Sequence, residues 1–210
     1  MTDEKSEARK RTLELLMVIV LSSTTILTAW SGFQSSKWGG AMSISFAQAS
    51  TARIEASRFD QTANSRAALQ VGLWTAWLQQ SQSDPKLADF LEQRFPEPLA
   101  TAQADWLETN PEKNPDAPDS PFAMPAYLLP EREAAVAADA RADAKYAEAL
   151  ANNQRGDNYT ILTVLFATVL FFTAMSGRVR ETRSQVALLS LAVVLGTVGI
   201  VFLTAFPKLV

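Results

Sequence analysis

Two carboxylates on one predicted helix come closest, by residue type and spacing, to a cation site. Asp139 and Asp143 stand four residues apart, so on a helix they share one face and offer oxygen ligands to a metal ion. The sequence contains no histidine and no cysteine, which excludes imidazole acid–base chemistry, thiolate nucleophiles and the usual zinc sites. We therefore expect both carboxylates to lie beside Arg141 and Lys145 on a solvated helix face, with no metal bound.

Basic and aromatic side chains between residues 38 and 106 allow two further kinds of site. Arg53, Arg58 and Arg66 lie on or beside an apolar helix stripe, where they would either clamp the carboxylate of a ligand or bridge to acidic residues of a partner helix. Four tryptophans would either line an apolar pocket for a lipid-like ligand or belong to the core, with the first as a membrane-interface anchor. They are Trp38, Trp74, Trp77 and Trp106. No phosphate loop or nucleophile elbow is present, so we predict no enzymatic activity, no catalytic residue and no cofactor.

A cluster of hydroxyl side chains interrupts the first apolar run of the sequence. In a membrane, such hydroxyls would either line a pore or bond to carbonyls of their own helix and to neighbouring helices. We favour helix packing over a pore. The residues are Ser22, Ser23, Thr24, Thr25 and Thr28.

The third apolar run carries a stripe of small residues. Ala192, Gly196 and Gly199 follow one another in steps of four and three, which places them on one helix face. Small residues let a neighbouring backbone approach closely where lipid offers no hydrophobic drive for helix pairing. The stripe therefore predicts a homo-oligomer that Gly196→Leu or Gly199→Leu would weaken. The alternative is that the stripe packs within one chain.

Three apolar runs must position these groups: Leu15 to Phe33, Tyr159 to Met175 and Val186 to Phe206. Each is long enough to cross a hydrocarbon core of about 30 Å at about 1.5 Å per helical residue. We predict an all-α integral membrane protein with three transmembrane helices and an extracytoplasmic helical bundle inserted between the first and the second. The expected segments are 1–12 (cytoplasmic tail), 13–33 (first span), 34–157 (extracytoplasmic domain), 158–176 (second span), 177–184 (cytoplasmic loop), 185–206 (third span) and 207–210 (extracytoplasmic C-terminus).

Basic residues set the expected orientation, because short loops rich in lysine and arginine stay on the cytoplasmic side of a plasma membrane. Two such segments flank the spans, and three spans place both on the same side. They contain Lys5, Arg9, Lys10 and Arg11 in the tail and Arg178, Arg180 and Arg183 in the second loop. Residues 34–157 hold 11 lysines and arginines against 17 carboxylates, a net charge of −6. That segment therefore repels nucleic acid, and nucleic acid is excluded as a partner.

Periodicity divides residues 34–157 into helices. One is expected from Ala41 to about Gln80, two short ones at 84–95 and 98–108, an irregular proline-rich loop at 110–130, and another long helix from Pro130. Aromatic residues of the first long helix, such as Phe59, are expected to pack against an alanine seam of the last. This bundle is the expected recognition surface.

The order of one span, a large domain and a hairpin is similar in layout to the proton-channel subunits of the Ton and Tol energisers. In that family the large domain is cytoplasmic, whereas the charges here place it outside. The helical domain is also similar in layout to four-helix ectodomains of bacterial sensory receptors. Neither resemblance rests on matching residues. We predict a non-enzymatic plasma-membrane protein that partners the lipid bilayer and acts by self-assembly or as an accessory subunit of another membrane protein. The alternatives are an oligomeric channel or transporter with a hydroxyl-lined pore, and a ligand sensor that signals through a membrane partner.

Overall fold

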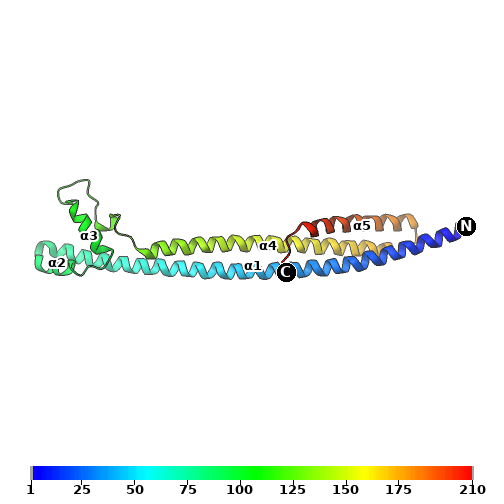
Figure 1. The fold of residues 1–210 in the computed structure, drawn as a ribbon, viewed down its shortest axis with the longest axis horizontal. Helices are drawn as coiled ribbons and strands as arrows, with labels where there is room; N and C mark the ends of the chain where they lie inside the picture. The colour runs from blue at the N-terminus through cyan, green and yellow to red at the C-terminus, as the bar shows by residue number, and fades with distance from the viewer. Residues whose placement is uncertain (1, 210) are drawn as a thin grey trace. The chain divides into compact units, whose positions relative to one another are not determined.

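The computed structural model describes the backbone of residues 2–209 and the side chains of residues 7 and 10–209, so Lys5 and Arg9 of the predicted basic tail lie outside the described side chains. Within this range the chain forms helices and no strand, which confirms the predicted all-helical class (Figure 1). The elements are α1 (Thr2–Ser83), α2 (Pro85–Glu92), α3 (Leu99–Glu108), the 3₁₀ turn η1 (Pro121–Ala123), α4 (Pro130–Ser176) and α5 (Thr182–Ala205).

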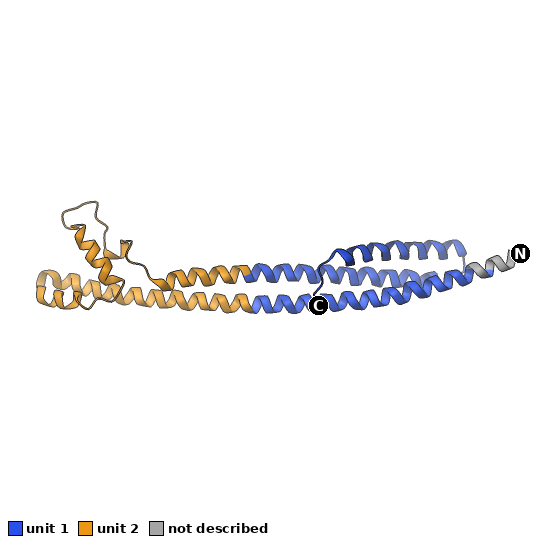
Figure 2. Cartoon of the chain, in the orientation of Figure 1, with its two compact units in different colours: residues 1–47, 145–210 blue, residues 48–144 orange. Residues whose placement is uncertain are grey.

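Among the described residues, α1, α4 and α5 are long and apolar enough to cross a membrane. The chain divides into two compact units (Figure 2). Unit 1 holds residues 1–47 and 145–210, and unit 2 holds residues 48–144. Helix α1 continues through Gly39 and Gly40 without a break, although the sequence suggested a new helix there. The segment boundaries and the extracytoplasmic insertion stay predictions.

Unit 1 packs α5 beside the adjoining parts of α1 and α4 (Figure 2). Its core consists of Trp38, Tyr159, Leu162, Phe166 and Leu203, drawn from all three helices. Each of the three helices thus contributes at least one large side chain to this core. Trp38 is buried in this core, and its role as a membrane-interface anchor stays a prediction.

After α5 ends, the chain is held by polar contacts to the other two helices of unit 1. The buried amide of Gln34 donates from Nε2 to the carbonyl oxygen of Leu209 at 3.1 Å and accepts from the Leu209 backbone N–H at 2.9 Å. The Tyr159 hydroxyl donates to the carbonyl oxygen of Pro207 at 3.1 Å. Residues 207–209 are therefore fixed to both α1 and α4.

In unit 2, α1 and α4 run antiparallel and meet along alanines (Figure 1). The buried positions on α1 repeat in steps of three and four, as in a coiled coil, and small side chains let the two backbones approach closely. They are Ala49, Ala52, Ala56 and Ala63 on α1 and Ala135, Ala138 and Ala142 on α4. Phe59, expected to pack against this seam, is half-buried, and its pairing with the alanines of α4 stays a prediction.

Beyond Ala63 the buried face follows a period of 3.5 residues, and Gln70 and Trp77 occupy the next inward positions. Val71 and Leu78, which a wider helical stripe would place inside, are exposed. Seven-residue steps from Ala63 place Gln70 and Trp77 inside, each one residue before the exposed Val71 and Leu78. A polar residue thus enters the core of unit 2.

The helical cap, defined here as residues 84–129, covers this end of α1. Its core contains Trp77 of α1 with Ala88, Phe95, Leu99 and Trp106 of the cap. The predicted start of α2 is confirmed, because the Asp84 carboxylate accepts from the backbone N–H of Leu87 at 3.2 Å and Pro85 is the first helical residue. Pro130 likewise begins α4, as predicted.

Candidate functional site

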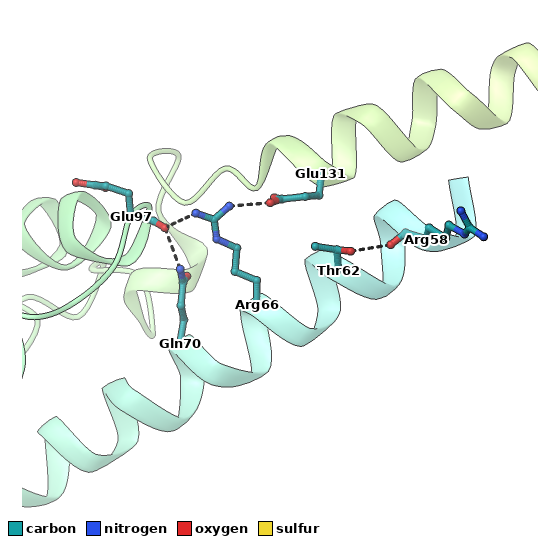
Figure 3. A network of polar contacts seen from close by, with 6 residues as sticks. All are labelled: Arg58, Thr62, Arg66, Gln70, Glu97 and Glu131. Carbon is teal, nitrogen blue, oxygen red and sulfur yellow. Dashed lines mark hydrogen bonds and ion pairs between the residues drawn. The ribbon is translucent and has the colours of Figure 1, made fainter. Parts of the chain in front are cut away.

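A polar junction joins three elements of unit 2 around the guanidinium of Arg66 (Figure 3). One nitrogen donates to Glu131 Oε1 of α4 at 2.8 Å, and another donates to the backbone oxygen of Glu97 at 3.0 Å. Gln70, one turn further along α1, donates to the same oxygen at 3.0 Å. The planar fork of arginine suits this bridging because its donors point in fixed directions. The junction therefore ties the helical cap to α1 and α4 together.

Four buried polar atoms of unit 2 have no hydrogen-bond partner among the described residues. They are Gln70 Oε1, Gln103 Nε2, Tyr127 Oη and Glu131 Oε2. The other end of the Gln103 amide accepts from Trp74 Nε1 at 3.0 Å, which fixes its orientation. Unpaired buried polar atoms are costly, and in native proteins they usually contact ordered water or a ligand. Gln70 and Glu131 belong to the junction, which therefore has spare hydrogen-bonding capacity.

Burial raises the pKa of the Tyr127 hydroxyl above its ordinary value, while the charges of Arg132 and Arg66 act in the opposite direction. The ring stacks edge-on against Phe122 with centroids 4.9 Å apart, and Phe122 in turn contacts Trp74 at 5.6 Å. Tyr127 is therefore held neutral at physiological pH within an aromatic row that leads back to α1.

A cavity of about 720 Å³ lies between the end of α1 and the helical cap in unit 2. Side chains from residues 77–82 of α1, with Trp106 and Leu107 of α3, form part of its wall, and the proline-rich loop between Asn110 and Asp119 forms another part. Both indole N–H groups are engaged, Trp77 with Glu92 at 3.1 Å and Trp106 with the Pro118 carbonyl at 2.6 Å. The volume falls within the range of small-molecule sites, which is roughly 300–1,000 Å³.

The loop that lines this cavity is held by its own short-range contacts. The Asn114 side chain donates to the Thr109 carbonyl at 3.1 Å and accepts from the Asp116 backbone N–H at 3.0 Å. Asn110 has a φ of 53°, in the left-handed region that asparagine tolerates better than most residues. The second half of the loop packs on the cap core through Phe122, Met124 and Tyr127.

The structure brings the predicted carboxylate pair to an arginine, with no cation site around it. Arg53 of α1 binds both Asp139 and Asp143 of α4, the latter at 2.7 Å. The hydrogen bonds to Asp143 and Asp139 raise the pKa of Arg53. Both carboxylates lie on a solvated face, with side chains 51% and 70% exposed, and the neighbouring Arg141 and Lys145 form their own ion pairs with Glu55 and Glu148. Across the described residues, no group of three potential metal ligands is close enough to hold an ion.

The three arginines of the predicted stripe have different roles. Arg53 and Arg66 bridge to carboxylates of α4, which was one of the two predicted alternatives. Arg58 forms no ion pair with a described carboxylate, and its side chain lies away from the junction (Figure 3). The clamp for a ligand carboxylate stays untested.

The hydroxyls of the first span bond mainly to their own helix. Ser22, Thr25 and Thr28 each donate to the carbonyl oxygen four residues earlier, at 2.8, 2.8 and 2.7 Å. Thr24 is buried in unit 1, whereas Ser23 is exposed. Back-bonding satisfies a hydroxyl in an apolar setting without a pore. This geometry favours the predicted packing role.

The small-residue stripe of α5 lies against α4 of the same chain. A Cβ added at Gly199 would stand 2.6 Å from Cε1 of Phe166, and one at Gly196 would stand 3.7 Å from Cγ1 of Val169. Ala192 is fully buried. The stripe therefore serves packing within one chain, and its role between chains stays a prediction.

Sequence reasoning missed the two buried glutamines of unit 2, although both follow a detectable pattern. Gln70 stands midway in the seven-residue steps from Ala63 to Trp77, and Gln103 belongs to the buried set Leu99, Ala102, Gln103 and Trp106, which has the spacing of one helix face. A scan against protein-family models and searches of curated proteins and of solved structures found no match to the chain. The function is therefore inferred from the contacts, burial and charges of the chain's own residues.

Proposed function

We propose that the chain is a non-enzymatic interaction protein of the plasma membrane, anchored by α1, α4 and α5, with unit 2 outside the cytoplasm. It acts by binding a second copy of itself or another membrane protein through the helical cap. The orientation rests on the basic residues that flank the apolar helices, which favour the cytoplasmic side.

The observation that supports this function best is an exposed apolar pair on α2. Leu87 and Phe90 are 41% and 51% exposed, while Ala88 and Leu91 of the same helix pack into the cap core. The Arg94 guanidinium lies 3.6 Å from the centre of the Phe90 ring. Aromatic residues and arginine are the side chains most often found at the energetic centre of protein interfaces.

The cap also holds this pair in a fixed position. Asp84 caps α2, Trp77 bonds to Glu92 at the other end of the helix, and the Arg66 junction holds the segment that follows. A surface that is already ordered loses little conformational entropy when a partner binds, so more of the contact energy contributes to affinity. These contacts favour a preorganised recognition surface.

Photo-crosslinking in native membranes tests the proposed surface. A benzoylphenylalanine at position 90 is expected to give an adduct, whereas the same probe at the exposed loop residue Glu112 is not. An adduct at a multiple of 22.9 kDa identifies self-assembly, and another mass identifies a foreign partner. Equal yields at both positions, or none at position 90, would contradict the proposed surface.

Site-directed labelling tests the orientation independently, because the chain contains no native cysteine. A cysteine at Glu112 is expected to react with an impermeant maleimide in intact cells, and one at Gly177 only after permeabilisation. The reverse pattern would place unit 2 in the cytoplasm.

A ligand sensor is the second candidate, and the cavity of about 720 Å³ beside Trp77 and Trp106 favours it. A ligand that enters this cavity is expected to change the tryptophan fluorescence of the purified protein and to raise its melting temperature. Blocking the cavity with Leu107→Trp should abolish both responses while leaving the Phe90 crosslink intact.

A further inference from the structure

An apolar groove of about 340 Å³ runs between α1 and α5 in unit 1. Leu13 and Leu16 form one wall, and the other consists of Val186, Leu189, Ser190, Val193 and Val194. The α5 wall covers nine residues, or about 12 Å at 1.5 Å per residue. Both helices are long and apolar enough to cross a membrane, so in a bilayer the groove opens towards acyl chains.

Basic side chains stand at one end of this groove on both walls. Lys10 precedes Leu13 by three residues on α1, and Arg183 precedes Val186 by three residues on α5. Residues three apart on a helix share a face, so each cation lies one turn beyond the apolar lining. The two helices therefore present positive charge at the same end of the groove.

These cations are available to a ligand. Lys10 and Arg183 are exposed, and neither forms an ion pair with a carboxylate among the described residues. Glu7, Glu14 and Glu181 are the described carboxylates nearby in sequence, and Glu181 accepts a hydrogen bond from the Ser184 hydroxyl at 2.9 Å. Among the described side chains of residues 7–14 and 177–184, five basic residues outnumber these three carboxylates.

We propose that this groove is a binding site for an anionic glycerophospholipid of the bilayer. One acyl chain lies along Leu13, Leu16 and Val193, and the phosphate contacts Lys10 and Arg183. Apart from the Ser190 hydroxyl, the side chains that line the groove are apolar, and an apolar lining favours an acyl chain as the ligand group. The cations select a headgroup with a net negative charge over a zwitterionic one. This site is independent of the recognition surface on the helical cap.

Competition between two lipids with the same acyl chains tests the headgroup contact. The full-length protein is purified in mild detergent, mixed with palmitoyl-oleoyl phosphatidylglycerol and phosphatidylcholine, and analysed by native mass spectrometry. The wild type is expected to retain phosphatidylglycerol in preference. Because each basic residue at a membrane surface contributes about a fivefold preference for anionic lipid, Lys10→Gln with Arg183→Gln should lower that preference by about 25-fold.

The matched control removes two cations elsewhere in unit 1, through Lys37→Gln with Lys208→Gln. It is expected to keep the wild-type preference. If it loses as much as the groove variant, or if the wild type retains both lipids equally, the proposed site is wrong.

A groove-filling variant separates the acyl-chain contact from simple charge attraction. Val193→Trp keeps every charge but occupies the groove, and it is expected to lose retention of phosphatidylglycerol while circular dichroism shows unchanged helicity. Ser190→Trp serves the same purpose if Val193→Trp does not fold. Wild-type retention by the folded variant would overturn the proposal, because charge without the groove would then suffice.

Discussion

Gln34 and Leu209, which are 175 positions apart in the sequence, exchange two hydrogen bonds through the side-chain amide of one and the backbone of the other. The amide is fully buried, so it loses its hydrogen bonds to water on folding, and these two contacts replace them. The pair fixes the chain beyond α5 to α1 and closes one end of the three-helix core of unit 1.

Replacing Gln34 by leucine is expected to release residues 207–209. The substitution keeps the side-chain volume but removes both hydrogen bonds, at a cost of about 1–2 kcal/mol in the free energy of unfolding. Amide hydrogen exchange at Leu209 should become about 5- to 30-fold faster. Gln154→Leu is the control, because the exposed Gln154 bonds only to Asn158 on the same helix. Unchanged exchange at Leu209 in the Gln34 variant would contradict the role assigned to the pair.

Two glycines of α5 should respond differently to the same methyl group. Gly199→Ala forces a Cβ into the Phe166 ring, whereas Gly196→Ala places one at ordinary contact distance from Val169. The first is expected to lower stability by about 1–3 kcal/mol and the second to change it little. Thermal unfolding in detergent measures both. Combining Gly199→Ala with Phe166→Leu should recover part of the loss, and equal effects of the two alanines would argue against this packing.

The Arg66 junction predicts a contrast between two arginines eight residues apart on α1. Arg66→Gln leaves Glu131 without its ion pair and removes one donor from the Glu97 carbonyl. Because the guanidinium is partly solvated, we expect a loss of about 1–2 kcal/mol. Arg58→Gln should stay within about 0.5 kcal/mol of the wild type. Thermal melts followed by circular dichroism give both values, and amide exchange in α3 shows whether the cap has loosened.

Alkaline pH should destabilise the wild type through Tyr127. Burial raises the folded-state pKa of its hydroxyl above the ordinary value of 10.0, so the neutral form is favoured in the fold. The resulting stability is fully present below pH 10 and is lost as the pH rises through the folded-state pKa. Tyr127→Phe should therefore melt at a more nearly constant temperature between pH 8 and 11 than the wild type does. The exposed Tyr146→Phe is the control, and identical curves for Tyr127→Phe and the wild type would contradict the burial argument.

The elements of the fold were predictable where local chemistry decides them. Asp84 followed by Pro85 marks the start of α2, Pro130 marks the start of α4, and three apolar runs mark the helices that can cross a membrane. Each of these signals lies within the helix that it predicts or next to it, so the sequence alone is enough to detect it.

The polar contacts that join the elements were not predictable in the same way. The partners of Gln34 and Arg66 lie 175 and 65 positions away, and no periodic pattern relates them. Of the candidate site, the arginine bridges were foreseen as one of two alternatives, while the burial of Gln70 and Gln103 was missed. Glutamine is seldom fully buried, so its polarity predicts exposure even where its position in a heptad points inward.

The alanine seam between α1 and α4 does not by itself set the register of the two helices, that is, which alanine of α1 faces which alanine of α4. Sliding α1 by a heptad, about 10 Å, would again set alanine at two of its four buried alanine positions, so the seam alone distinguishes the alternatives only in part. The contacts that a slide would break are the ion pairs between the two helices, in which Arg53 pairs with Asp139 and Asp143, Arg66 with Glu131, and Arg141 with Glu55. The register of α1 against α4 in unit 2 therefore depends largely on a few ion-paired side chains. The alanine seam contributes buried apolar surface but constrains the register less.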